Sequence, residues 1–324
     1  MRTILQLESG LKSDLLQFGL IRLSGQDAID FAHRQLSNDI ISLRPDSARF
    51  AGYLTSHGLL LATALVWKRQ SDVMLMVARD VVVEIIKRLM IYVLRSKVQI
   101  TNESEKFSIV GTGGKKATEA VSTIFGEMPE TLYARAENET GEIIRVSNAF
   151  GSPRYLLITP NENAKELSLD SLMNTTDEDW ELGDIEAGIP QIYATTQDRF
   201  LPRALNMEEV NGLNWTKGCF PGRGTIAHSN PQKQQMQRMH ALTENFSPAQ
   251  LADIRPGSNI FNPHFPQSSA GTVIRIARRD EQRIDCLTVI EKENITSTAL
   301  HLGAVHGPKL FADSLPYEPG HISR

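Results

Sequence analysis

The stretch Phe18-Gly-Leu-Ile-Arg-Leu-Ser-Gly25-Gln-Asp-Ala28 joins an apolar run to the start of an amphipathic segment. Apolar residues dominate Phe18–Leu23, which predicts a short strand, and Gly25 is typical of a turn. The following segment, Gln26–Leu36, carries apolar residues at helical spacing and predicts a helix. A strand followed directly by a helix therefore begins the fold.

Further strands and a second helix follow this unit without a regular alternation. Strands are predicted at Arg49–Leu54, Leu59–Trp67, Val73–Val77 and Val98–Ile100, and a helix at Asp80–Leu94. A doubly wound parallel sheet would alternate strand and helix throughout. The order observed here instead indicates an α+β first domain, over residues 1–104, which we expect residues of about 190–235 to complete.

Two more units are expected after residue 104. The second, 105–189, contains a strand ending at Ser108–Gly111, a helix at Lys116–Phe125, strands at Ile143–Ser147 and Tyr155–Thr159, and a polar stretch at Asn161–Asp179. The polar Pro231–Arg238 is interpreted as a crossover into the third unit, 236–324. There, short strands separated by Pro and Gly, clearest at Thr272–Ala277 and Cys286–Ile290, predict a small all-β barrel-like domain.

Composition limits the function classes. The chain has 324 residues, 41% hydrophobic and 22% charged, with a formal net charge of −4, which is typical of a globular protein of two or three domains. The acidic balance disfavours a phosphate-backbone binder, so no direct nucleic-acid contact is expected. The two cysteines lack disulfide or zinc spacing, and we predict no metal site.

No membrane attachment is expected either. Glu8 and Asp14 interrupt the N-terminal region where a signal peptide would need an apolar core. The apolar runs Gly58–Trp67 and Val81–Leu94 are too short or too interrupted by charge to span a bilayer. We therefore expect a cytoplasmic monomer.

The segment from Lys217 to Ala227 offers the clearest candidate for chemistry. Cys219 lies between Lys217 and a glycine-rich turn, and a nearby ammonium with free backbone N–H groups would favour the reactive thiolate. Cys219 and Lys217 are the candidate catalytic residues. The alternative is an inert loop cysteine, and Cys286 is expected to be a small buried hydrophobic residue.

Several separated motifs resemble one family. They are Phe18–Ala28, Gln35-Leu-Ser-Asn-Asp39-Ile, Trp180-Glu-Leu-Gly-Asp-Ile-Glu186-Ala-Gly188-Ile-Pro190, Leu201-Pro202 with Asn206, and Lys217-Gly218-Cys219. In this order they are similar to YgfZ-type proteins, which are folate-binding proteins related to the aminomethyltransferase (T-protein) of the glycine cleavage system. The resemblance extends to Leu315-Pro316-Tyr317 and covers nearly the whole chain.

The resemblance implies an α+β, three-domain, ring-like architecture of the aminomethyltransferase/YgfZ type, with a reduced folate such as tetrahydrofolate in a central opening. It also implies a role in maintaining or repairing iron–sulfur clusters in client enzymes, including enzymes that modify tRNA. Phe18 and Trp180 take the places of the aromatic residues that flank the folate. The glutamate tail would need cations, for which Arg199, Arg203 and Lys233 are candidates.

The chain departs from the family pattern in two places. Phe18 stands where a tryptophan is usual, although any aromatic face can stack. Arg223-Gly224 replaces the usual Gln-Glu after the cysteine, so the carboxylate is lost.

Alternatives therefore stay open. One is an aminomethyltransferase that uses Asp39, although a surface or helix-capping role for Asp39 is preferred. Another is a folate-responsive interaction protein without catalysis. Whether the protein is an enzyme is undecided by sequence.

Overall fold

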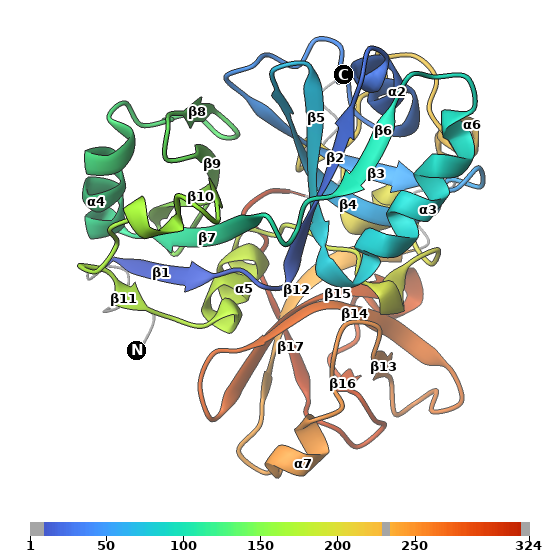
Figure 1. Cartoon of the computed structure of the whole chain (residues 1–324). Coiled ribbons are helices and arrows are strands. Elements are labelled where there is room, and N and C mark those ends of the chain that lie inside the picture. Colours follow the sequence, from blue (N-terminus) through green and yellow to red (C-terminus); the bar gives the residue numbers. More distant parts are fainter. Residues whose placement is uncertain (1–9, 229–233, 319–324) are drawn as a thin grey trace.

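The computed structural model describes residues 10–228 and 234–318 and shows an α+β protein made of three sheets (Figure 1). The first sheet has the order β3-β4-β5-β2-β6, all antiparallel neighbours. Its strands are β2 (Phe18–Ser24), β3 (Ala48–Leu54), β4 (Leu60–Arg69), β5 (Asp72–Ala78) and β6 (Gln99–Asn102). Helices α2 (Ala28–Gln35) and α3 (Val82–Val93) complete this unit, so the elements predicted here are confirmed within a few residues.

Alternation along β2 explains how this sheet has two buried faces. Ile21 and Leu23 lie in a core shared with α2 and α3, whereas Phe18 and Leu20 lie in a core on the opposite face. Successive side chains of a strand point to opposite sides, and both sides of β2 are apolar. The sheet therefore needs a second layer besides its helices.

The second sheet supplies that layer. Its order is β11-β1-β7-β10-β9-β8, and helix α4 (Lys115–Phe125) packs on its outer face. Its strands are β1 (Leu11–Asp14), β7 (Phe107–Gly113), β8 (Arg135–Glu137), β9 (Glu142–Ala149), β10 (Ser152–Pro160) and β11 (Met173–Asn174). The first strand of the described chain thus pairs with β7 and β11, outside the unit formed by its sequence neighbours.

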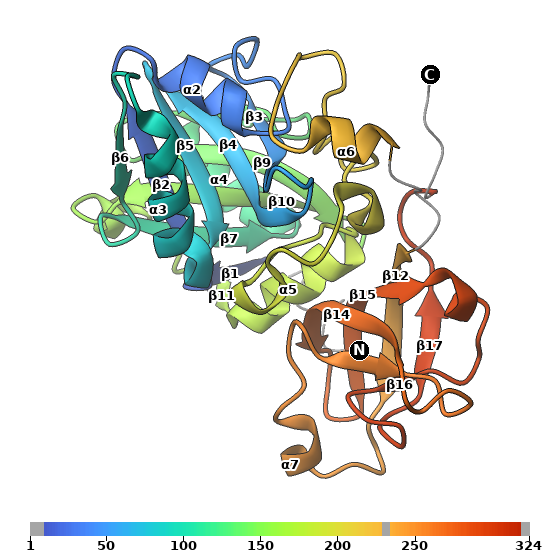
Figure 2. The same ribbon diagram turned by 90° about the vertical axis from the view of Figure 1, so that its right-hand side faces the viewer.

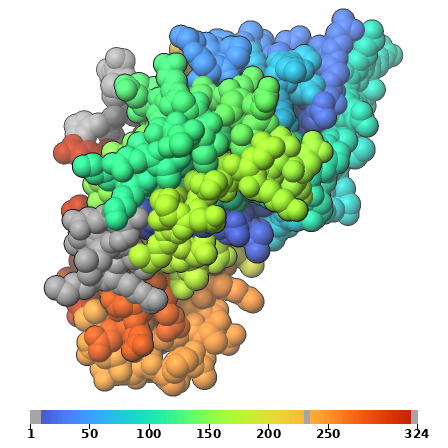
Figure 3. Space-filling view, turned by 60° about the vertical axis from the view of Figure 1, so that its left-hand side comes forward, coloured from blue at the N-terminus to red at the C-terminus, as the bar shows by residue number. Residues whose placement is uncertain are grey.

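The two sheets pack face to face, with helices on both outer sides (Figure 2). Their shared core contains Leu65 and Trp67 from the first sheet, and Ile144 and Leu156 from the second. The indole N–H of Trp67 donates to Glu142 across this interface at 3.1 Å. Figure 3 shows the second unit, in green, between the N-terminal unit and the C-terminal unit, in orange.

The third sheet is a curled antiparallel half-barrel of order β16-β13-β14-β15-β12-β17, which confirms the barrel-like C-terminal unit. Its strands are β12 (Gln234–Leu242), β13 (Asn259–Phe261), β14 (Ser269–Arg278), β15 (Arg283–Glu291), β16 (His301–Leu302) and β17 (Leu310–Asp313), with a short helix α7 (Pro248–Leu251). Cys286 is fully buried in its core.

Three local predictions were wrong. Residues 234–238, interpreted as part of a crossover, belong to β12, in which Met236, Met239 and Ala241 are buried. Residues 231–233 of that stretch lie outside the described part of the chain. Helix α6 (Arg223–His228) occupies the end of the supposed glycine-rich turn. Helix α5 (Asp177–Glu186) begins inside the stretch described as polar, and it packs between the two face-to-face sheets and the half-barrel.

No helix in the described part of the chain is both long and apolar enough to cross a bilayer.

Candidate functional site

Phe18 and Trp180, far apart in the sequence, line one cavity at the centre of the molecule. Its walls come from all three units: Phe50 and Leu65 from the first sheet, Leu156 from the second, and Arg275 from the half-barrel. The cavity is narrow, with a volume of about 50 Å³. We call it the inner chamber.

A larger chamber opens beside it. This outer chamber has a volume of about 460 Å³ and includes Arg145, Glu209 and Tyr317 in its walls. Tyr133, Val146, Ser147 and Ile189 line both chambers and form the boundary between them. The two spaces are therefore contiguous, and a ligand entering the outer chamber would meet these residues before reaching Phe18 and Trp180.

Trp180 is tightly packed rather than open to the chamber. Only 2% of its surface is exposed. The Arg154 guanidinium lies 4.5 Å over its ring centroid, and a Cβ at Gly111 would be 2.3 Å from the ring carbon Cε3. Arg154 thus covers a face of the indole, so a flat ligand reaches Trp180 at its edge or must displace Arg154.

A buried ionic cluster lies beside the indole. Arg154 donates to Asp184 at 2.8 Å, and Arg275 donates to Asp184 at 3.0 Å and to Glu181 at 2.7 Å. Tyr193 donates to the other oxygen of Glu181 at 3.1 Å. Two guanidinium groups therefore face two carboxylates, and this pairing offsets the cost of burying each charge.

Burial shifts the titration of this cluster. Burial raises the pKa of Glu181, although the charge of Arg275 acts in the opposite direction. Burial alone would lower the pKa of Arg275, but the charges of Glu181 and Asp184 outweigh it, so that pKa is raised. Arg275 stays protonated at any physiological pH and fastens the half-barrel to α5.

The two arginines expected to bind a glutamate tail lie elsewhere. Arg199 donates to Thr272 Oγ1 at 3.2 Å, and Arg203 donates to Glu208 at 3.2 Å. Neither lines the inner or the outer chamber. Arg145 does line the outer chamber, where burial lowers its pKa. Lys233 lies outside the described residues.

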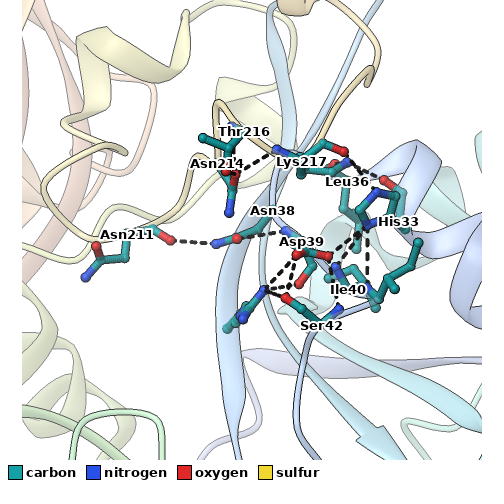
Figure 4. A network of polar contacts seen from close by, with 12 residues as sticks. His33, Leu36, Asn38, Asp39, Ile40, Ser42, Asn211, Asn214, Thr216 and Lys217 are labelled. Atoms are coloured by element: carbon teal, nitrogen blue, oxygen red, sulfur yellow. Dashed lines mark hydrogen bonds and ion pairs between the residues drawn. The ribbon is translucent and has the colours of Figure 1, made fainter. Parts of the chain in front are cut away.

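Lys217 is used to fix a helix end. Its ammonium donates to the backbone carbonyls of His33 and of Leu36, the latter at 2.7 Å, at the C-terminal end of α2 (Figure 4). Such carbonyls have no partner within the helix, and a cation is favourable there. Burial lowers the pKa of Lys217 to about 8, against the opposing effect of Asp39.

Asp39 belongs to the same network. Its carboxylate accepts from the Ser42 backbone N–H at 3.1 Å and lies 3.2 Å from His33 Nδ1 and 3.8 Å from Arg49. Burial raises the pKa of Asp39, but the hydrogen bonds from Ser42 and the charges of His33 and Arg49 outweigh it and lower that pKa. The carboxylate thus orders a turn after α2.

Cys219 is exposed and lines neither chamber. The structure therefore does not bring Cys219 and Trp180 to one cavity. The loop around the cysteine does approach another backbone closely: a Cβ at Gly222 would be 2.3 Å from Gly58 Cα, in the turn between β3 and β4. Arg223, at the departure from the family pattern, donates to the Trp215 carbonyl at 2.7 Å.

Sequence reasoning missed the ionic cluster and Tyr133. Glu181 and Asp184 lie inside the motif Trp180–Pro190, so their positions were visible but their partners were not. Nothing in the sequence marks Tyr133, and its unusual backbone φ of 62° is visible only in the structure. Among residues 10–228 and 234–318, no group of three His, Cys, Asp or Glu side chains is placed to hold a metal ion.

Comparisons with known proteins agree with the motifs. No model of a known protein family matches the chain. The chain is 24% identical over 313 residues to the tRNA-modifying protein YgfZ of Sodalis glossinidius, covering 94% of this chain and 92% of the relative. It is 26% identical over 245 residues to the YgfZ protein of Yersinia pseudotuberculosis, covering 74% and 73%.

A solved structure shows the same fold. The aminomethyltransferase T of the Bartonella henselae glycine cleavage system superposes with a TM-score of 0.74 at 16% identity, covering 97% of this chain and 88% of that one. At this identity the likeness concerns the fold. Together with the YgfZ relatives it confirms the resemblance expected from the motifs, and the chain is a homologue of YgfZ-type proteins built on the aminomethyltransferase fold.

Proposed function

We propose that this protein binds a reduced folate, such as tetrahydrofolate, in its central chambers and thereby supports the maintenance or repair of iron–sulfur clusters in client enzymes, including enzymes that modify tRNA. The observation that carries the proposal is the convergence of Phe18 and Trp180 on one cavity between the three units. A mostly apolar, concave site with a few polar groups is typical for a flat aromatic ligand.

The geometry suggests how the ligand lies. The inner chamber, at about 50 Å³, does not hold a pterin without movement, so the ring enters from the outer chamber as Tyr133 or Arg154 shifts. Gln191 and Asp184 in the inner chamber offer oxygen acceptors to the amino group of the ring. The glutamate tail stays in the outer chamber near Arg145, which replaces Arg199 and Arg203 as the cation of choice.

Calorimetric titration with tetrahydrofolate tests this placement. Trp180→Leu, which removes the aromatic face, should weaken binding roughly 5- to 100-fold, since an aromatic contact contributes about 1–3 kcal/mol. Arg145→Met should weaken it roughly 10- to 100-fold through loss of a charge-assisted hydrogen bond. The matched controls are Trp215→Leu and Arg203→Met, which change the same residue types outside the chambers and should leave the affinity unchanged. Equal effects of the two pairs would contradict the site.

The cysteine needs a separate test. Because Cys219 is exposed and outside the chambers, thiol chemistry would take place at the surface, on a partner rather than on the folate. Lys217 then positions the loop and is not a reacting group. In a strain lacking the protein, Cys219→Ala should fail to restore cluster-dependent enzymes. Full restoration would favour the alternative, a folate-responsive interaction protein without catalysis.

The contacts of Asp39 disfavour the aminomethyltransferase alternative. Asp39, the carboxylate considered for it, is engaged by Ser42, His33 and Arg49 and lines neither chamber. Release of methylenetetrahydrofolate from a lipoyl-bound aminomethyl group by the purified protein would restore that alternative.

A further inference from the structure

Helix α3 is apolar on two faces. Val82, Ile85 and Leu89 pack into the core beneath the first sheet. On the other side, Val83, Met90, Ile91 and Leu94 are 58%, 57%, 67% and 87% exposed. A surface helix normally turns charged and polar residues to water, so a second apolar face marks an interaction surface.

The exposed residues form a single stripe. Val83, Lys87, Met90 and Ile91 recur at spacings of four, three and one residues, which places them on one side of the helix, and Leu94 follows as the residue that caps its C-terminal end. We call these five residues the outer stripe of α3. At 1.5 Å per residue the stripe is about 16 Å long, which matches roughly three turns of a partner helix.

The backbone at the end of the stripe is unfavourable for a leucine. Leu94 caps α3 with a φ of 42°, in the left-handed region where glycine is usual. A glycine there would relieve both the backbone strain and the exposure of an apolar side chain. The side chain of Leu94 is therefore best explained by a contact that it makes with a partner.

The charges around the stripe indicate the chemistry of that partner. Glu84 pairs with Arg88 at 2.7 Å along the helix, so these two charges satisfy each other. Lys87 in the middle of the stripe and Arg95 just beyond its end have no carboxylate partner in the described part of the chain. A partner with acidic residues beside an apolar ridge would complement both features.

We propose that the outer stripe of α3 is a docking site for an acidic amphipathic helix of another protein. Helix-in-groove and helix-on-helix recognition uses apolar anchors at this spacing, with flanking charges for specificity. Pairing with a second copy is disfavoured because a two-fold axis at the centre of the stripe would bring the two Lys87 ammonium groups within about one helical turn of each other.

The surface is independent of the proposed folate site. Helices α2 and α3 cover one face of the first sheet (Figure 2). Phe18 lies in the core on the opposite face and lines the inner chamber. A partner on α3 therefore leaves both chambers open. Docking on α3 does not require a folate in the chambers.

A designed peptide tests the proposal on the full-length protein. The probe is a helix-stabilised peptide of about 15 residues, or four turns, with leucines on one face and glutamates beside them. Fluorescence anisotropy should show binding, and Ile91→Asp should weaken it at least about tenfold. Lys87→Glu should reverse the preference in favour of the same peptide with lysines. Phe265→Asp is the matched control, because Phe265 is 64% exposed on the half-barrel. This variant should bind the acidic peptide as tightly as the wild type does.

Other occupants give different results. Equal binding of acidic and basic peptides, or no binding, would overturn the proposal. Sedimentation that shows a dimer lost in Ile91→Asp would assign the stripe to a second copy. Binding to phosphatidylcholine–phosphatidylglycerol vesicles that Ile91→Asp abolishes would assign it to a membrane surface. Circular dichroism and thermal unfolding verify folding of each variant, and Met90→Gln serves as a milder change on the same face.

Discussion

Gly111 sets the position of the Trp180 indole ring. A Cβ there would lie 2.3, 2.6 and 2.8 Å from three ring atoms of Trp180, closer than packed atoms tolerate. We expect Gly111→Ala to destabilise the protein by about 1–3 kcal/mol, as overpacking does, and to weaken tetrahydrofolate binding with it. Urea unfolding measures the first effect. Gly224→Ala, in α6 with nothing within 4 Å of the added Cβ, should stabilise the protein by up to about 1 kcal/mol, and a similar loss in both variants would contradict the packing argument.

Lys217 gives stability a dependence on pH. Burial lowers its pKa to about 8 in the folded protein, whereas an unfolded lysine titrates near about 10.4. Between these values the unfolded chain holds the extra proton, so the free energy of unfolding should rise with pH in this window relative to Lys217→Met. Below pH 8 Lys217 is protonated in both the folded and the unfolded protein. The difference in free energy of unfolding between wild type and Lys217→Met should therefore not change with pH there.

Urea unfolding of the wild type and of Lys217→Met at several pH values from 7 to 10 measures this difference. Arg34→Met provides the control, because a charge lost from the exposed last turn of α2 should leave the difference independent of pH. A constant difference for Lys217→Met as well would show that its ammonium is not desolvated.

The two thiols should differ sharply in reactivity. Cys219 is exposed, whereas Cys286 is fully buried and burial raises its pKa. A thiol reagent such as dithiobis(nitrobenzoate) should therefore label Cys219 in the native protein and Cys286 only in urea. Saturating tetrahydrofolate should leave the rate at Cys219 unchanged, because the sulfur lies outside the chambers. Protection by the folate would show that the loop closes over the ligand.

Among the helices and strands, α5 joins the second sheet to the half-barrel through ion pairs. Arg275 from β14 reaches Glu181 and Asp184 on α5, and Arg154 from β10 reaches Asp184. Arg275→Met would leave Glu181 buried with no cation beside it and Asp184 with Arg154 alone, and we expect the free energy of unfolding in urea to fall by about 3–5 kcal/mol. Arg255→Met, at an exposed position of the half-barrel, should hardly change the free energy of unfolding. Partial rescue by Glu181→Gln in the Arg275→Met background would attribute the loss to unpaired charge.

Helices and strands were predicted correctly where apolar residues recur at a single helical or strand spacing. Strand β2 and helix α2 follow their apolar patterns and were found within a few residues. No helix was predicted over the residues of α5, because its buried side carries Glu181 and Asp184, whose charged partners come from distant strands. Strand β12 was missed because polar side chains flank its buried methionines. A local sequence pattern does not reveal that a buried charge is neutralised by a residue from a distant part of the chain.

The candidate site shows the same limit at the scale of the whole molecule. Phe18 and Trp180 converge on one chamber as the resemblance led us to expect. The cations Arg199 and Arg203 were chosen by charge and sequence position, yet Thr272 and Glu208 hold them elsewhere. Which arginine faces a cavity depends on how the three units pack, and the spacing of residues along one segment of sequence does not reveal that packing.

A ligand between three units should stabilise all of them together. At a concentration one hundred times its dissociation constant, tetrahydrofolate should add about 2.7 kcal/mol to the free energy of unfolding. Limited proteolysis should then slow at the second unit and at the half-barrel alike. Protection confined to a single unit would indicate a site within that unit and contradict the shared chambers.

The position of strand β1 in the second sheet constrains the order in which the nascent chain folds. Strand β1 is translated before the strands of the first sheet, whereas its partners β7 and β11 follow only after that whole sheet has been translated. Until then the nascent chain carries an unpaired strand, and the second sheet closes late, by contacts between residues far apart in sequence. A truncation that removes Leu11–Asp14 would leave β7 with an open edge, and such a shortened product should be prone to aggregation although its first sheet is intact.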